Sequence, residues 1–246
     1  MSKIKKLLPV IILVITVYAI REKPYDEFKY YRILCLGDSY TVGLHVHYTR
    51  TWPVLLAEAM LKEDLKVKSP KIYARAGWET HDLVDVVSRL PDRKAYDFIF
   101  IMAGVNNHIN GESIKVYRQS IKSLIRAAQK LVPDPGRIYF FSIPDWGATP
   151  YAAHKNTLKI RREIDSYNSA CYSETKIQGC GYIDITPVSR RGLADPSYLT
   201  IDGLHPSGRM YREWARLAFQ ILKEERGRFT EDITRLKKKG NIIKYR

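Results

Sequence analysis

The chain has 246 residues, of which 45% are hydrophobic and 27% are charged, proportions ordinary for a globular protein. This length suffices for one sizeable hydrophobic core or two small ones. The 41 Lys and Arg residues exceed the 26 Asp and Glu residues, which gives a formal net charge of +15. Part of this excess lies at the two ends and no nucleic-acid-binding motif accompanies it, so we predict no nucleic-acid partner.

The chain begins with three lysines, which precede an apolar run from Leu7 to Ile20. A basic start followed by a short apolar run is typical of a secretory signal peptide, here with a small-residue cleavage site after Ala19. The run is shorter than the ~20 residues of a comfortable membrane span, but Ile4 extends it, so an uncleaved anchor is the alternative. In both cases residues 1–27, which include the start of a linker, are predicted to direct export to the periplasm or the cell exterior.

The middle of the chain alternates between apolar runs typical of buried strands and segments with helical periodicity. Strands are predicted at residues 31–36, 71–74, 97–102, 137–143 and 182–185. Helices are predicted at residues 52–61, 81–90, 113–131, 158–172 and 207–225. This alternation indicates a parallel sheet with helices on both faces. We predict a single α/β domain over residues 28–230.

The C-terminal segment, residues 231–246, is predicted to be a basic tail, with six Lys or Arg residues and no acid from Arg235 onward. Such a tail suits contact with an anionic membrane surface, together with the N-terminal segment, or simply solubility.

The three cysteines have two interpretations. Cys35 lies in the first predicted strand and is expected to be a small buried hydrophobic residue. Cys171 and Cys180 are close in sequence, and an oxidising compartment would allow them to form a disulfide, which the sequence leaves open. No Cys or His spacing indicates structural zinc.

Small and polar residues follow the predicted strands. Gly37-Asp38-Ser39 follows the first strand, Gly77 the second, Asn106-Asn107 the third and Asp145-Trp146 the fourth. In a parallel sheet the carboxyl ends of the strands lie at one edge, where ligands bind. These residues are therefore expected to meet, although each motif alone is also compatible with an ordinary turn.

An ester-cleaving site needs a nucleophile, a base, a group that orients the base, and donors for the developing oxyanion. Ser39 offers the hydroxyl, and His205 is the best base because Asp202 lies three residues before it. That spacing lets the carboxylate reach the imidazole Nδ1 within one turn of a loop, whereas an exposed polar loop is the alternative. The backbone N–H groups of Ser39 and Gly77 and the side-chain amide of Asn106 are the candidate oxyanion donors.

The four blocks Gly37-Asp38-Ser39, Gly77, Gly104-Val105-Asn106-Asn107 and Asp202-Gly203-Leu204-His205-Pro206 resemble, in order and spacing, those of the SGNH hydrolase family, also called GDSL esterases/lipases. The resemblance runs from about Arg32 to about Leu222. It implies a flavodoxin-like three-layer α/β/α fold with a five-stranded parallel sheet, and ester hydrolysis without a metal or other cofactor. It also implies a nucleophilic Ser39, a basic His205 partnered by Asp202, and an oxyanion hole made by Ser39, Gly77 and Asn106.

Two positions depart from the family pattern. Tyr40 stands where the family's name-giving Leu would be, and Asn107 stands where the third block usually has Asp. Since the oxyanion role belongs to Asn106, activity is expected to survive. Asp38 beside Ser39 is expected to hold the serine turn by accepting backbone N–H groups, and not to be catalytic.

Several residues are expected at the mouth of the site. Tyr40, Trp78, Asn107 and Trp146 are candidate substrate-binding residues, although the aromatic ones could equally be core. Four histidines also follow the first three strands, namely His45, His47, His81 and His108. They are expected to contact substrate or solvent, and no metal site is predicted because no carboxylate or cysteine has matching ligand spacing.

The sequence thus favours an exported serine esterase acting on small-molecule or glycan esters through an acyl-serine. The absence of an evident lid-like apolar insertion favours short acyl esters or acetylated carbohydrate over long-chain lipid. An acyltransferase of the same fold and a catalytically silent ligand-binding module are the alternatives.

Overall fold

The computed structural model describes residues 30–63, 65–91 and 95–238, and of residues 226–238 it describes the backbone only. The unit that carries the site begins at Tyr31. The predicted signal peptide or anchor lies outside the described residues, as does the end of the basic tail. Within the described part of the chain, no helix has both the length and the apolar character that a membrane crossing requires.

Five strands form one parallel sheet in the order β2-β1-β3-β4-β5. Their bounds are β1 Ile33–Gly37, β2 Lys71–Ala74, β3 Phe98–Met102, β4 Ile138–Phe141 and β5 Gly181–Ile183. Gly37 at the end of β1 pairs with Ala74 at the end of β2 and with Met102 at the end of β3. This register brings the segments that follow these three strands to one edge of the sheet.

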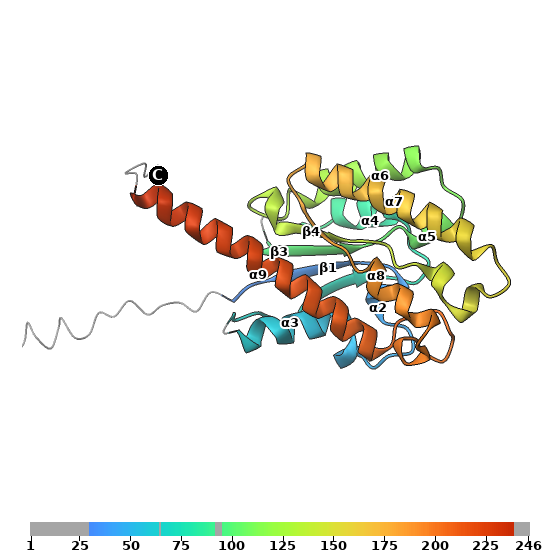
Figure 1. The fold of residues 1–246 in the computed structure, drawn as a ribbon. Helices are drawn as coiled ribbons and strands as arrows, with labels where there is room; N and C mark the ends of the chain where they lie inside the picture. The colour runs from blue at the N-terminus through green and yellow to red at the C-terminus, as the bar shows by residue number, and fades with distance from the viewer. Residues whose placement is uncertain (1–29, 64, 92–94, 239–246) are drawn as a thin grey trace, which may run out of the picture. The chain divides into compact units, whose positions relative to one another are not determined.

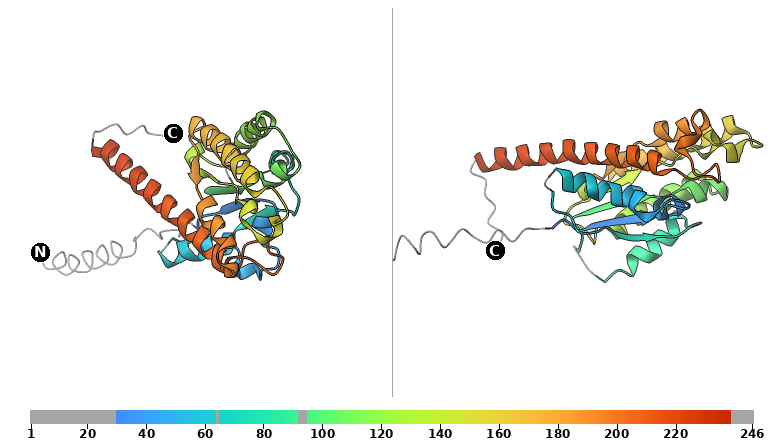
Figure 2. Two further views of the ribbon diagram at one scale, coloured as in Figure 1. Left: turned by 45° about the vertical axis from the view of Figure 1, so that its right-hand side comes forward. Right: turned by 90° about the horizontal axis from the view of Figure 1, so that it is seen from below.

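Helices cover both faces of the sheet (Figure 1). Their bounds are α2 Ser39–Val42, α3 Trp52–Lys62, α4 Thr80–Ser88, α5 Val105–Ile109, α6 Ile114–Ala128, α7 Thr157–Ile177, α8 Thr186–Ser189 and α9 Gly208–Lys238. Helices α3 and α9 pack side by side on one face, as Figure 2 shows from below, while α6 packs between α4 and α7 on the other. The predicted three-layer α/β/α fold with a five-stranded parallel sheet is confirmed.

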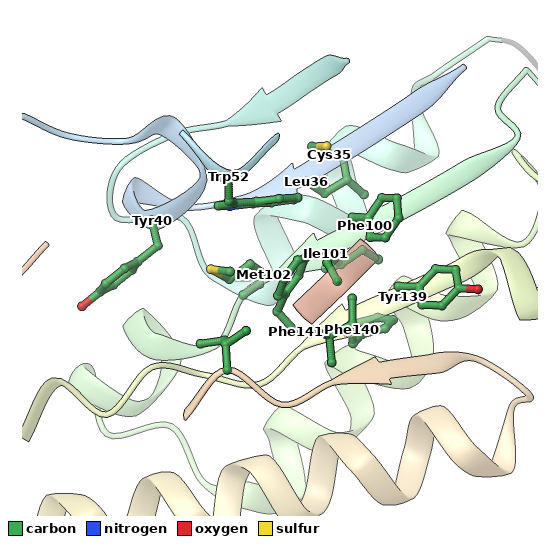
Figure 3. Close-up of a cluster of buried hydrophobic side chains, with 14 of the residues drawn as sticks. Cys35, Leu36, Tyr40, Trp52, Phe100, Ile101, Met102, Tyr139, Phe140 and Phe141 are labelled. Carbon is green, nitrogen blue, oxygen red and sulfur yellow. The ribbon is translucent and has the colours of Figure 1, made fainter. Parts of the chain in front are cut away.

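The core forms where aromatic side chains of the sheet meet the helices. Every residue of β1, β3 and β4 is buried, the pattern of a parallel sheet covered on both faces. The ring centroids of Trp52 on α3 and Phe141 on β4 lie 4.6 Å apart, and Phe100 stacks on Tyr139 at 5.2 Å. Figure 3 shows these four side chains within the buried cluster. This packing makes the strand ends a rigid support for the loops beyond them.

The structure differs from the sequence-based expectation in two places, and it decides a third point that the sequence left open. The turns after β1 and β3 are short helices, α2 and α5, whose first residues follow Asp38 and Gly104. Helix α9 continues through Gly227 to Lys238, past residue 230, and contains no proline that would end it. The disulfide that the sequence left open is not formed, since Cys171 and Cys180 are separate buried thiols.

Candidate active site

The turn after β1 presents Ser39 at the start of α2. The Asp38 carboxylate caps this helix, because its Oδ1 accepts the Tyr40 backbone N–H at 2.9 Å. Gly37 has no room for a side chain, since a Cβ there would lie 2.1 Å from Thr41 Oγ1 and 2.5 Å from Met102 O. The tight Gly37 turn and the Asp38 cap together fix the direction of the Ser39 side chain.

Ser39, His205 and Asp202 form a continuous hydrogen-bonded chain. His205 Nε2 lies 2.9 Å from Ser39 Oγ, and His205 Nδ1 lies 2.6 Å from Asp202 Oδ2. Ser39 and His205 are each only 8% exposed, so the contact between them is largely shielded from water. The imidazole ring also packs on Tyr40, with ring centroids 5.2 Å apart.

The loop before α9 holds the Asp202 carboxylate in one orientation. Asp202 Oδ1 accepts from Thr200 Oγ1 at 2.7 Å, from Leu204 N at 2.9 Å and from His205 N at 3.0 Å. Oδ2 is thereby left to face the imidazole. Burial raises the pKa of Asp202, but the hydrogen bonds from His205 and Thr200 outweigh burial and hold this pKa well below its usual range. The carboxylate is therefore ionised at neutral pH.

Three hydrogen-bond donors surround the serine turn. Asn106 Nδ2 donates to Trp78 O at 2.9 Å and lies 3.5 Å from Asp38 Oδ2, so only one of its two N–H groups is firmly bound. Among the described residues, the backbone N–H groups of Ser39 and Gly77 have no hydrogen-bond acceptor. Gly77 has φ +83°, which favours glycine, and it is exposed at the edge of the site.

The four candidate substrate contacts have different surroundings. Tyr40 is 3% exposed and lies under the imidazole, which makes it a supporting residue, while Trp78 is half-buried and offers its carbonyl to Asn106. Asn107 is fully buried, which argues against the predicted substrate contact. Its amide bonds the Thr80 backbone N–H and hydroxyl and the Glu112 carboxylate. An Asn suits this place because an Asp could not donate to Glu112.

Trp146 lines a cavity of about 690 Å³, whose lining does not include Ser39, Asp202 or His205. His108 also lines it and lies on α5, the helix that carries Asn106. Tyr151, another lining residue, donates its backbone N–H to Gly203 O at 3.2 Å, next to Asp202. The cavity wall is thus linked to the site through His108, which lies two residues from Asn106, and through Tyr151. Trp146 is fixed in its wall because the indole N–H donates to His108 Nδ1 at 3.1 Å.

Two residues at this site escaped the sequence analysis. Thr200 positions Asp202, and a Thr two residues before an Asp is a weak signal of such a side-chain contact. His45 was expected only at the mouth, but its Nε2 lies 3.3 Å from Asp202 Oδ2. Nothing in the spacing of His45 and Asp202 along the sequence could indicate this contact.

Asp38 gives a testable dependence of stability on pH. Its burial raises the pKa of the carboxyl to about 7. Between about pH 4 and pH 7 the native state keeps a proton that the unfolded chain loses, so the wild-type free energy of unfolding falls as pH rises through this window. Asp38→Asn has no titrating group at this position, so its free energy of unfolding does not fall in this way, and its side-chain oxygen can still accept the Tyr40 N–H. Between pH 4 and pH 8, the free energy of unfolding of the variant is expected to rise by on the order of 1–4 kcal/mol relative to that of wild type.

Urea unfolding at several pH values measures this difference. Asp85→Asn, at an exposed position of α4, is the matched control and is expected to follow the wild-type pH profile. Parallel profiles for wild type and Asp38→Asn would show that burial does not raise the pKa of Asp38.

The comparisons with known proteins agree with this fold and with the family resemblance. A parallel three-layer sandwich with a Ser–His–Asp cluster at its strand ends is the architecture of SGNH-type carboxylic ester hydrolases, and the chain is an enzyme of that class. Residues 35–213 match the GDSL-like Lipase/Acylhydrolase family, and the chain belongs to that family. A search of the curated proteins gives no match.

Solved structures share the fold at low sequence identity. A member of the lipolytic protein G-D-S-L family from Veillonella parvula has a TM-score of 0.61 at 18% identity, and the alignment covers 78% of this chain and 98% of that one. Axe2, an acetylxylan esterase from Geobacillus stearothermophilus, has a TM-score of 0.59 at 17% identity, covering 78% and 93%. A family 3 carbohydrate esterase from Clostridium thermocellum has a TM-score of 0.61 at 15% identity, covering 78% and 94%.

Proposed function

We propose that this protein is an exported serine esterase that cleaves short-chain acyl esters or acetyl esters of carbohydrates. The observation that carries the proposal is the chain of contacts from Ser39 Oγ to His205 Nε2, at 2.9 Å, and from His205 Nδ1 to Asp202 Oδ2, at 2.6 Å. Export rests on the sequence pattern of the apolar N-terminal segment alone.

The residues take the following roles in this mechanism. Ser39 Oγ attacks the ester carbonyl while His205 Nε2 accepts its proton, and ionised Asp202 stabilises the imidazolium that forms. The oxyanion accepts hydrogen bonds from the backbone N–H groups of Ser39 and Gly77 and from the less firmly held N–H of Asn106. The imidazolium then protonates the leaving alcohol, and a water molecule activated by the same imidazole hydrolyses the acyl-serine.

The cavity lined by Trp146 and Tyr151 is the place that we propose for a polar leaving group. Three aromatic rings, of Trp146, Tyr151 and Tyr167, line it together with the charged side chains of Lys155 and Lys159. Aromatic rings provide stacking faces and charged groups provide hydrogen bonds, which together suit a sugar. The acetylxylan esterase and the carbohydrate esterase among the structural neighbours give the same substrate class additional support.

The acyl-length preference tests this proposal. We expect kcat/KM of the full-length protein to be highest for two- to four-carbon p-nitrophenyl esters and to fall toward the twelve-carbon ester. A buried CH₂ contributes about 0.8 kcal/mol only where it meets an apolar wall, and the sequence has no evident lid-like apolar insertion that would cover a long acyl chain. A steady rise in kcat/KM from two to twelve carbons would contradict the short-chain assignment.

Transfer to a sugar hydroxyl is the second candidate function, because the same acyl-serine serves both reactions. The two are separated by measuring free acid and acylated sugar after reaction in the presence of sugar acceptors. If the protein turns over an ester and Ser39→Ala does not, the alternative of a catalytically silent ligand-binding module is excluded.

A further inference from the structure

His45 lies against the carboxylate of the proposed triad without belonging to it. Its Nε2 is 3.3 Å from Asp202 Oδ2, and its ring centroid is 6.2 Å from that of His205. The side chain is half exposed, so ions in solution can reach it. Its φ is +61°, a left-handed conformation that is uncommon for a residue other than glycine.

The spacing of His45 and Asp202 matches that of two ligands of one metal ion. In tetrahedral zinc coordination, metal–ligand distances of ~2.0–2.2 Å put neighbouring ligand atoms about 3.3 Å apart. The distance between His45 Nε2 and Asp202 Oδ2 has this value, 3.3 Å. His205 Nδ1 lies closer, 2.6 Å from Asp202 Oδ2, so the imidazole must move away from the carboxylate by roughly 0.7 Å when both bind one ion. One ligand atom from each of His45, Asp202 and His205 lies within 4.8 Å of the others. Two imidazoles and a carboxylate are a ligand set that zinc accepts, with the fourth position left for water.

We infer that His45, Asp202 and His205 form an inhibitory site for a divalent transition-metal ion, with zinc as its typical occupant. Because the triad's role in esterase activity is itself the proposed function, the inhibition rests on that proposal, whereas the binding does not. The ion bridges His45 Nε2 and Asp202 Oδ2 and takes His205 Nδ1 as its third ligand.

Metal binding at this site prevents His205 from acting as the general base, because it changes the tautomer of the imidazole. In the working state the Nδ1 proton of His205 bonds Asp202, and the Nε2 lone pair faces Ser39. A metal on Nδ1 uses the lone pair of that nitrogen, so the single proton of the neutral imidazole moves to Nε2. Nε2–H then donates to Ser39 Oγ and can no longer accept its proton. No proton is gained or lost by the ring as a whole.

A second cluster on the molecule provides a comparison. Glu79, His81 and Glu112 also bring one ligand atom each within 4.8 Å of the others. Both carboxylates there are already hydrogen-bonded, Glu79 to Asn110 and Glu112 to Asn107. None of these three side chains bonds the imidazole of His205, whose two nitrogens face Asp202 and Ser39. An ion bound at this second cluster would therefore leave the base in its working tautomer.

The test measures binding and inhibition separately on the full-length protein. Zinc chloride is titrated into the protein in a calorimeter, and its effect on p-nitrophenyl acetate hydrolysis is measured beside magnesium chloride and with EDTA reversal. We expect one zinc binding event whose Kd equals the inhibition midpoint, and no inhibition by magnesium, which prefers oxygen ligands. His45→Asn, which tolerates the same backbone conformation, is expected to raise both values at least ~10-fold.

His81→Asn is the matched control and is expected to leave the Kd and midpoint of that event at their wild-type values. Equal zinc Kd values in wild type and His45→Asn, or zinc bound through His45 without loss of turnover, would overturn the inference. If wild type lacks Ser39-dependent turnover, the proposed function fails. The weaker zinc binding of His45→Asn in the calorimeter still decides whether the metal site exists.

Discussion

Ser39→Ala is expected to lower kcat for p-nitrophenyl acetate by about 10⁴-fold or more, with little change in KM. Ser39 Oγ lies 2.9 Å from His205 Nε2, and among the described residues no other side chain is hydrogen-bonded to this nitrogen. Replacing the serine side chain by a methyl group removes the nucleophile but leaves the buried imidazole of His205 in place, so the fold is expected to persist. Stopped-flow release of p-nitrophenolate measures the loss, and circular dichroism checks the fold.

The control for this substitution is a serine outside the site. Ser166→Ala changes an exposed serine of α7 and is expected to keep wild-type activity. A fluorophosphonate should label wild type and Ser166→Ala once, on Ser39, and should leave Ser39→Ala unlabelled, as mass spectrometry of the tryptic peptides would reveal. Residual activity above one-tenth of wild type in Ser39→Ala would rule out the acyl-serine mechanism.

The fold was readable from the sequence because each strand carries a strong local signal. Residues 98–102 form an unbroken apolar run after Asp97, and the structure places β3 there, at Phe98–Met102, with every residue buried. A parallel sheet then requires all carboxyl ends to lie on one edge. The convergence of Ser39, Asn106 and His205 follows from topology, even though these residues are far apart in the sequence.

What the sequence could not provide is the direction in which each polar side chain points. Asn106 and Asn107 are neighbours with the same side chain, yet one faces the serine turn and the other is fully buried against Thr80. That difference arises because the two residues lie on α5, where successive side chains are rotated by about 100°. Without knowledge that α5 is a helix, both amides looked equally available to a substrate.

The contact of His45 with Asp202 also could not be predicted from the sequence, because the two residues are far apart along the chain. Metal-ligand spacing in a sequence reports only ligands on one local element. Here the imidazole belongs to the loop after α2 and the carboxylate to the loop before α9. Only the three-dimensional arrangement brings them within 3.3 Å of each other, so the sequence predicted no metal site.

Asp202→Asn is expected to lower kcat by about 10³–10⁴-fold without unfolding the protein. Three donors, Thr200 Oγ1 and the backbone N–H groups of Leu204 and His205, converge on Asp202 Oδ1. The amide oxygen of an Asn must take that position, so its NH₂ group is forced to face His205 Nδ1. Nδ1 must then accept, which moves the imidazole proton to Nε2, opposite Ser39. The base is thus held in the wrong tautomer.

Kinetics of single and double variants test this argument. Because Ser39 and Asp202 act through the same imidazole, the losses are not additive, and Ser39→Ala/Asp202→Asn is expected to be no slower than Ser39→Ala alone. Thr200→Val is the matched variant, since it removes one Oδ1 donor and leaves two, so it should cost far less than Asp202→Asn. If Asp202→Asn keeps more than a tenth of wild-type kcat, the carboxylate does not set the tautomer of His205.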